Sequence, residues 1–223
     1  MDQKKIYGVI TGDLIKSAEF RASRNDVLFC LKGILQSAPK LEPHKDEFII
    51  FSDIFRGDSF QGILSQPSSS LKTALYIHAE LLREPVGSTH IESRLGIGLG
   101  PVDFLDKDRI LESDGIAFRL SGQALDQTDK YRRVTMLSDS DEINQHLNVL
   151  AASLDAIMQR WSTEQAEAIS LWLQGNTQES IANKLGIKQP AVHQRLQLAG
   201  HFAIREILDY FIWLTKKYKA IDL

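Results

Sequence analysis

The sequence predicts an α+β protein in which a ferredoxin-like antiparallel sheet domain is followed by an all-α domain. Apolar segments with strand or helix periodicity follow the order β-α-β-β-α-β-α-β over the first part of the chain. After residue 160 only helical periodicity remains, and one short stretch there has the spacing of a helix-turn-helix. We therefore expect a sheet domain at 1–140, a connecting helix at 141–160, and a helix-turn-helix domain with a C-terminal dimerisation helix at 161–223.

Apolar composition, periodicity and turn residues justify the elements of the sheet domain in order. The expected strands cover residues 6–11, 47–55, 60–64, 91–99 and 133–137. The expected helices cover residues 23–37, a segment from 66 that Pro85 ends, a short stretch at 116–125, and 141–160. Gly96, Gly98 and Gly100 interrupt one strand without a helix opening at its end, so they predict close packing of a central strand rather than a dinucleotide fingerprint. His78 lies among apolar helix positions and is expected in the core.

The side chains of two aspartates, Asp13 and Asp58, are expected to lie close together. Asp13 follows the first strand, and Asp58 lies at the tip of the hairpin between the second and third strands. Because this topology puts the two positions at one sheet edge, the pair would supply the oxygen ligands that Mg²⁺ prefers. The alternative is that Asp13 caps a turn and that Asp58 is the ordinary acid of a Gly-Asp turn. Both interpretations remain open at this point.

Four segments of this domain carry a resemblance: VITGDLIKS, RGDSFQG, SRLGIGLGPV and DGIAFRLSGQAL. Together they resemble the SatD family and, more distantly, the palm domains of class III nucleotidyl cyclases and GGDEF proteins, over roughly residues 6–137. In the cyclases, the positions matching Asp13 and Asp58 hold the metal ions that bind the nucleoside triphosphate. The resemblance thus implies a palm fold with Mg²⁺ as cofactor and a nucleotide as ligand.

The chain departs from the cyclase pattern where the chemistry would be performed. Ile54 stands at the position of the base-recognising lysine, and Arg119 and Gln123 stand at the positions of the late asparagine and arginine. Loss of a group that stabilises developing phosphate charge costs orders of magnitude in rate. We therefore expect a degenerate, sensor-like domain without cyclase activity, and we assign no catalytic residue.

The helical domain opens with a capping signal and leads into the helix-turn-helix. Ser162 followed by Gln165 predicts a capping box for a helix at 163–174. Residues 177–198 then show Ala182, Gly186 and Val192 at the spacing of a helix-turn-helix, with Gly186 at the positive-φ turn position. The unit at 161–196 resembles the DNA-binding helices of sigma-factor region four. An ordinary αα-hairpin is the alternative.

The second helix of this motif is expected to enter the DNA major groove. Residues at the start of this helix are candidates for contacts with base edges, and the residues that flank them are candidates for contacts with phosphates. The candidate DNA-binding residues are Thr177, Gln178, Lys188, Gln189, Pro190, His193, Gln194 and Arg195. Residues 160–223 carry eight Lys and Arg against six Asp and Glu, while the whole chain has a net charge of −3. Such a weakly basic region favours binding to double-stranded DNA as a homodimer.

The last expected helix, at 202–218, has more apolar surface than a small helical domain can cover. It would pack across the two domains or pair two copies of the chain. The single Cys30 excludes a disulfide framework, and no apolar run is long enough to span a membrane. We therefore predict a cytoplasmic transcriptional regulator that binds DNA. The alternatives are a metal-dependent nucleotidyl-transfer or nucleotide-hydrolysing enzyme with a helical dimerisation tail, and a module whose αα-hairpin binds protein.

Overall fold

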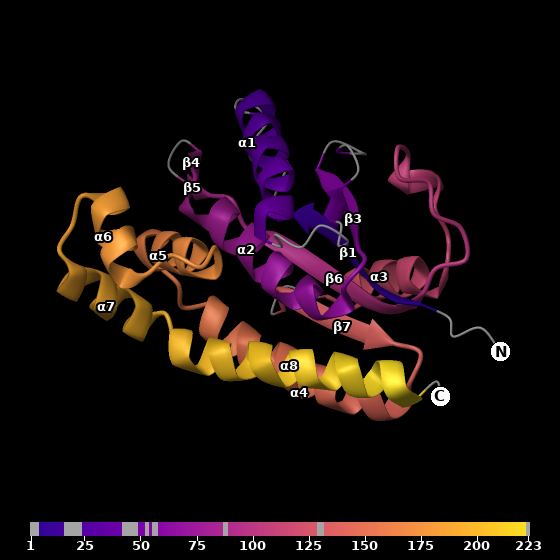
Figure 1. Cartoon of the computed structure of the whole chain (residues 1–223). Helices are drawn as coiled ribbons and strands as arrows, with labels where there is room; N and C mark the ends of the chain where they lie inside the picture. The colour runs from indigo at the N-terminus through magenta and orange to yellow at the C-terminus, as the bar shows by residue number, and fades with distance from the viewer. Residues whose placement is uncertain are drawn as a thin grey trace.

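The computed structural model describes residues 5–15, 24–41, 49–51, 54, 58–86, 89–128 and 132–221. Its main sheet has the strand order β2-β3-β1-β6-β7, and a second, two-stranded sheet pairs β4 with β5 (Figure 1). The strands are β1 (Ile6–Leu14), β2 (Ile49–Phe51), β3 (Ser59–Leu64), β4 (Pro85–Val86), β5 (Thr89–His90), β6 (Ser93–Pro101) and β7 (Val134–Ser138). The helices are α1 (Arg24–Ser37), α2 (Ser70–Arg83), α3 (Ile116–Gln127), α4 (Asp141–Met158), α5 (Thr163–Leu173), α6 (Gln178–Leu185), α7 (Gln189–Leu198) and α8 (His201–Ile221), with 3₁₀ turns η2 (Ala38–Leu41), η3 (Pro67–Ser69) and η4 (Ile110–Glu112).

The order of the first four strands of the main sheet confirms the ferredoxin-like prediction. β2, β3, β1 and β6 are antiparallel neighbours, as the alternation of the sequence predicts. The fifth strand, β7, is parallel to β6, so the sheet is mixed. A parallel pair needs a crossover connection, and α3 supplies it. Of the strand expected at 47–55, the structure describes the centre as β2 together with residue 54. The rest of it, and turn residues 56 and 57, lie outside the described residues.

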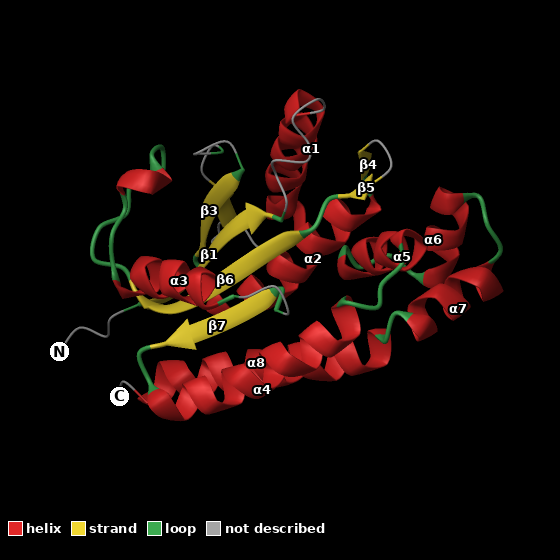
Figure 2. Cartoon of the chain, turned by 180° about the vertical axis from the view of Figure 1, so that it is seen from behind, coloured by secondary structure: helices red, strands yellow, loops and turns green. Residues whose placement is uncertain are grey.

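Helices cover both faces of the sheet, whereas the ferredoxin-like fold expected from the sequence has helices on one face only. On β6 the side chains of Leu95, Ile97 and Leu99 join the main core on the side of α2. Successive strand residues point to opposite faces, so Gly96, Gly98 and Gly100 face the other side. There they let α3 approach closely, because a Cβ at Gly98 would lie 2.1 Å from the carbonyl oxygen of Ala117. Figure 2 shows α3 lying over this face.

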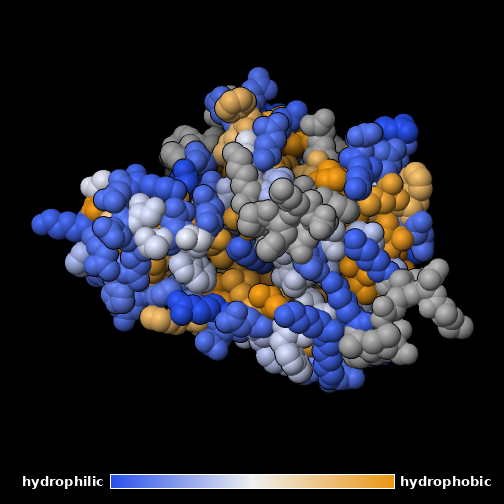
Figure 3. Space-filling view, in the orientation of Figure 1, coloured by the Kyte–Doolittle hydropathy of each residue, from blue (hydrophilic) through white to orange (hydrophobic). Residues whose placement is uncertain are grey.

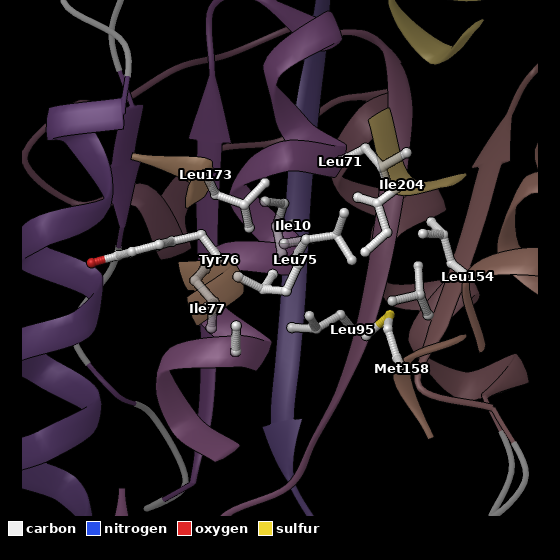
Figure 4. Close-up of a cluster of buried hydrophobic side chains, with 14 of the residues drawn as sticks. Ile10, Leu71, Leu75, Tyr76, Ile77, Leu95, Leu154, Met158, Leu173 and Ile204 are labelled. Carbon is white, nitrogen blue, oxygen red and sulfur yellow. The ribbon is translucent and has the colours of Figure 1, made fainter. Parts of the chain in front are cut away.

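One hydrophobic core joins the sheet to the C-terminal helices. It includes Leu75 of α2, Leu95 of β6, Met158 of α4, Leu173 of α5 and Ile204 of α8 (Figure 4). His78 is part of this interior, as expected: it is 2% exposed and its Nδ1 lies 3.2 Å from the hydroxyl oxygen of Ser93. The core is therefore continuous across the domain boundary proposed at 160/161, and the division into domains stays a prediction.

The last helix, α8, runs beside α4 along the lower edge of the molecule (Figure 1). Its inward face is buried through Ile204, Phe211, Leu214 and Tyr218. The Tyr218 hydroxyl donates to the carbonyl oxygen of Leu99 at 3.4 Å and also to Asp139, so α8 reaches the strands β6 and β7. One of the two interpretations of this helix was that it packs within the chain, and one face of α8 does so.

Candidate functional site

The helix pair α6–α7 is positioned by α5 and by the ends of the neighbouring helices. Ser162 and Gln165 form the expected capping box at the start of α5. Immediately before it, the indole Nε1 of Trp161 donates to the carbonyl oxygen of Ala199 at 2.9 Å, which ties the start of α5 to the end of α7. Figures 1 and 2 both show α6 and α7 at the end of the molecule remote from the main sheet. The contacts with α5 and Trp161 thus hold the helix pair in place, and its outer side is exposed.

The turn between α6 and α7 has the geometry that the sequence predicts. Gly186 ends α6 in the left-handed region with φ +65°, where a residue with a side chain would be strained. The amide of Ile187 then donates to the carbonyl oxygen of Ala182 at 3.1 Å and closes the helix end. Ala182 and Val192 are both buried between the helices. These contacts set the angle at which α7 leaves the turn.

The N-terminal half of α7 presents polar side chains outward. Pro190 lies in its first turn, as expected. The exposed residues at and around the start of the helix are Lys188, Gln189, Pro190, His193 and Gln194. At the start of α6, Thr177 is exposed and Gln178 is half-buried, and the Oε1 of Gln178 accepts from the Nε2 of Gln189 at 2.9 Å. The structure therefore brings all these candidate DNA-binding residues to one end of the helix pair.

Arg195 is placed differently from the other candidates. Its guanidinium Nη1 lies 3.2 Å from Oε2 of Glu167 on α5, and the Arg195 side chain is 27% exposed. In this position it links α7 to α5. A phosphate contact by Arg195 would have to use the N–H groups of its guanidinium that do not bind Glu167.

The second group of candidates lies at the sheet edge, where Asp13 meets an arginine that the sequence reasoning missed. Asp13 is the direct strand partner of Arg94 on β6 and of Ser59 on β3. The two oxygens of the Asp13 carboxylate accept from Nε and Nη2 of Arg94 at 3.0 Å and 2.5 Å. The signal that would have found Arg94 is register, because directly opposed residues of antiparallel strands share a face.

Asp58 joins this cluster from the start of β3, one residue before the strand partner of Asp13. The pKa of Arg94 is raised, first by its hydrogen bond to Asp13 and then by the charges of Asp13, Asp126 and Asp58. Arg94 thus pairs directly with Asp13, and the charges of Asp126 and Asp58 favour its protonated form. Because both oxygens of Asp13 are already occupied by Arg94, these residues do not fit Mg²⁺ in the arrangement described.

The remaining positions of the cyclase comparison serve other contacts. Ile54 packs against the core, and Arg119 forms ion pairs with Asp103 and Asp114. Within the described ranges, no three His, Cys, Asp or Glu side chains are grouped so as to hold a metal ion. In the same part of the chain, no helix is both long enough and apolar enough to cross a membrane.

Comparison with known proteins identifies the family. The SatD family model matches residues 7–205, which include the sheet, α6 and α7. The chain belongs to the SatD family. No curated protein matches this SatD-family chain.

Solved structures similar to this SatD-family protein include cyclases. The active GGEEF domain of a diguanylate cyclase from Vibrio cholerae is 17% identical with a TM-score of 0.44, covering 61% of this chain and 85% of that one. Two structures of a bacterial light-regulated adenylyl cyclase are 16% and 14% identical, with TM-scores of 0.42 and 0.41. In both, the match covers 60% of the SatD-family chain and 43% of the cyclase chain.

Proposed function

We propose that this SatD-family protein is a cytoplasmic transcriptional regulator that binds double-stranded DNA through α6 and α7. The observation that carries the proposal is the exposed start of α7, which follows a tight turn at Gly186 whose left-handed conformation is the one that a helix-turn-helix requires. In such motifs the N-terminal residues of the second helix contact base edges in the major groove. The family match and the fold are compatible with this role and do not themselves assign it.

The side chains at this surface suit two kinds of DNA contact. Gln189, His193 and Gln194 carry donors and acceptors that pair with base edges. Lys188, at the N-cap of α7, is suited to phosphate, and the Thr177 hydroxyl, which accepts from the Ser180 amide, still has its proton to donate to a phosphate. The specificity of binding should therefore depend on the glutamines and the histidine, and its salt dependence on the lysine.

A homodimer would present two such surfaces to a two-fold operator. The outer side of α8 exposes Phe202, Tyr210 and Trp213, which are 57%, 38% and 51% exposed. We define these three side chains as the α8 aromatic patch and propose that it pairs two copies of the chain. Positions 202, 210 and 213 recur at helical spacing, so they form one stripe that a second copy can cover.

The sheet domain would act as a sensor in this proposal. α2 packs against α5, and the hydroxyl of Ser170 on α5 donates to the carboxylate of the buried Glu80 on α2. A ligand that favoured one arrangement of this contact would shift the position of α6 and α7, which are built on α5.

Anisotropy measurements on labelled fragments selected from genomic DNA test the proposal. We expect saturable, sequence-preferring binding that weakens steeply with salt. Lys188→Ala should weaken binding to all sequences and reduce the salt slope by about 1 per site, whereas Gln189→Ala and His193→Ala should relax preference at single base pairs by about 1–3 kcal/mol.

Gln145→Ala, at an exposed glutamine of α4, is the matched control and should bind like the wild type. Absence of salt-dependent, sequence-preferring binding by the wild-type protein would exclude the DNA-binding proposal. If Lys188→Ala and Arg195→Ala left DNA binding unchanged, the helix pair would instead be a protein-binding module.

A metal-dependent nucleotidyl-transfer or nucleotide-hydrolysing enzyme is the second candidate. The observation that favours it is the shared sheet edge of Asp13 and Asp58. The bidentate contact of Arg94 with Asp13 opposes it, because Mg²⁺ would have to displace the guanidinium. Incubation with Mg²⁺ and each nucleoside triphosphate distinguishes the two candidates, since turnover abolished by Asp58→Ala would establish the enzyme.

A further inference from the structure

A cavity of about 530 Å³ lies between η3, α2, the end of α5 and α8. It is distinct from both the sheet-edge cluster and the outer face of α7. Gln66, Ser68 and Ser69 line it from η3 and the residue before it, Lys72 from α2, and Trp172 from the end of α5. The volume falls within the range of small-molecule sites. Figure 3 shows a strip of apolar atoms between polar margins along the boundary of α2 and α8.

One stripe of α8 forms the opposite wall. Arg205, Leu208, Asp209, Ile212 and Lys216 all line the cavity, at helical spacings of three and four residues. The stripe begins and ends with a cation, and its middle is partly apolar. At about 1.5 Å per residue, the helix rises by about 16 Å from Arg205 to Lys216. The wall is therefore long enough for a ligand with chemically different ends.

The two ends of the cavity differ in chemistry. At one end, the ring of Trp172 lies 5.9 Å from that of His201, one turn before Arg205. At the other, Lys219 donates to Gln66 at 2.6 Å, which places the C-terminal half of α8, with Lys216, beside the hydroxyls of η3. An aromatic ring is thus at one end, and serine hydroxyls and a cation are at the other.

The charge of the lining favours an anion. Lys72, Arg205 and Lys216 face one acid of the lining, Asp209. Lys72 also donates to the carbonyl oxygen of Leu41 at 3.3 Å, which fixes its ammonium group in place. Ser69, at the N-cap of α2, makes no side-chain capping bond, so its hydroxyl is not used by the helix.

We propose that this cavity binds a nucleotide. Its phosphates would contact Lys216, Lys72 and the hydroxyls of Ser68 and Ser69, and its base would stack on Trp172 beside Arg205. The ligand would bridge α2, α5 and α8. These helices connect the main sheet to α6 and α7. This binding site does not depend on DNA recognition, but its use as a regulatory site rests on the proposed function.

Calorimetric titration of the 223-residue chain in EDTA tests the site. The probes are ATP, GTP, adenosine and inorganic triphosphate. We expect saturable binding of at least one nucleoside triphosphate, and binding of adenosine and of triphosphate at least roughly tenfold weaker. Lys216→Ala should weaken nucleotide binding by roughly tenfold or more, whereas Trp172→Ala should weaken nucleotide but not triphosphate binding.

Lys217→Ala is the matched control, because Lys217 is the next residue of α8 but pairs with Glu142 on α4 at 2.6 Å. Equal affinities of Lys216→Ala and Lys217→Ala would overturn the proposal, as would adenosine binding as tightly as ATP. Loss of nucleotide binding in Asp58→Ala would move the site to the sheet edge and also overturn it. If nucleotide binds as expected but DNA does not, the site stands and only the proposed function fails.

Discussion

Both carboxylate oxygens of Asp13 accept hydrogen bonds from Arg94, at 3.0 Å from Nε and 2.5 Å from Nη2. The guanidinium thus pairs with Asp13 at the sheet edge where the sequence suggested a metal ion. A fixed positive charge there neutralises the carboxylates and repels a second cation.

Arg94→Met should therefore convert this edge into a cation site. Removing the guanidinium frees both oxygens of Asp13 beside Asp58, so we expect the affinity for Mn²⁺ to rise by roughly tenfold or more. Electron paramagnetic resonance of free Mn²⁺ measures the gain. Adding Asp58→Asn to the variant should abolish it. Equal Mn²⁺ affinities of Arg94→Met and the wild type would show that Arg94 does not exclude metal.

The close approach of α3 to β6 predicts opposite effects at two glycines. A Cβ at Gly98 would lie 2.1 Å and 2.4 Å from backbone atoms of α3, so Gly98→Ala must push the helix away from the sheet. We expect a loss of roughly 2 kcal/mol or more in the free energy of unfolding. Gly122, within α3, has open space where a Cβ would lie, so Gly122→Ala should gain roughly 0.5–1 kcal/mol through helix propensity. Urea denaturation checks both, and equal effects would contradict the packing argument.

Buried His78 makes stability depend on pH. Burial, and then the charge of Arg133, lower its pKa from 6.5 to about 4. Between these two pH values the unfolded chain therefore binds a proton at His78, whereas the folded protein does not. The stabilisation that neutral, buried His78 contributes is complete above pH 6.5 and is lost as the pH falls toward 4. Between pH 7 and pH 5 this amounts to about 2 kcal/mol.

The matched variant is His78→Gln, whose free energy of unfolding should fall by about 2 kcal/mol less than that of the wild type over the same interval. Denaturant titrations at several pH values measure the difference. The comparison of slopes cancels other groups such as His201, whose pKa burial also lowers. Parallel stability curves for the two proteins would contradict the assignment.

The α8 aromatic patch predicts the effect of a charge on self-association. Trp213→Glu should raise the dissociation constant of the proposed dimer by roughly tenfold or more, since it buries a charge in an apolar contact. Sedimentation over a range of concentrations measures it. Leu111→Glu, at an exposed residue of η4, is the control and should associate like the wild type. A wild-type chain that stays monomeric at every concentration would remove the dimer from the proposal.

Periodicity and turn chemistry were sufficient to predict most of the fold. Four features follow from local rules, and the structure confirms them: the interior position of β6, the end of α2 before Pro85, the capping box at Ser162 and the positive φ of Gly186. The helix at 116–125 was expected, but its position on the second face of the sheet was not, because that face of β6 is specified by glycines, which carry no hydrophobic signal. Arg94 was missed because its partner is remote in sequence and is fixed only by strand register.

The contacts of Tyr218 make the packing of the sheet depend on a helix that is synthesised much later. This side chain is 1% exposed and bonds to groups at the ends of β6 and β7. During translation the strands emerge first, and they meet α8 only after the helices between β7 and α8 have also been synthesised. Until then the flank of the sheet that α8 covers is exposed, so we expect the nascent chain to be most prone to aggregation at this stage.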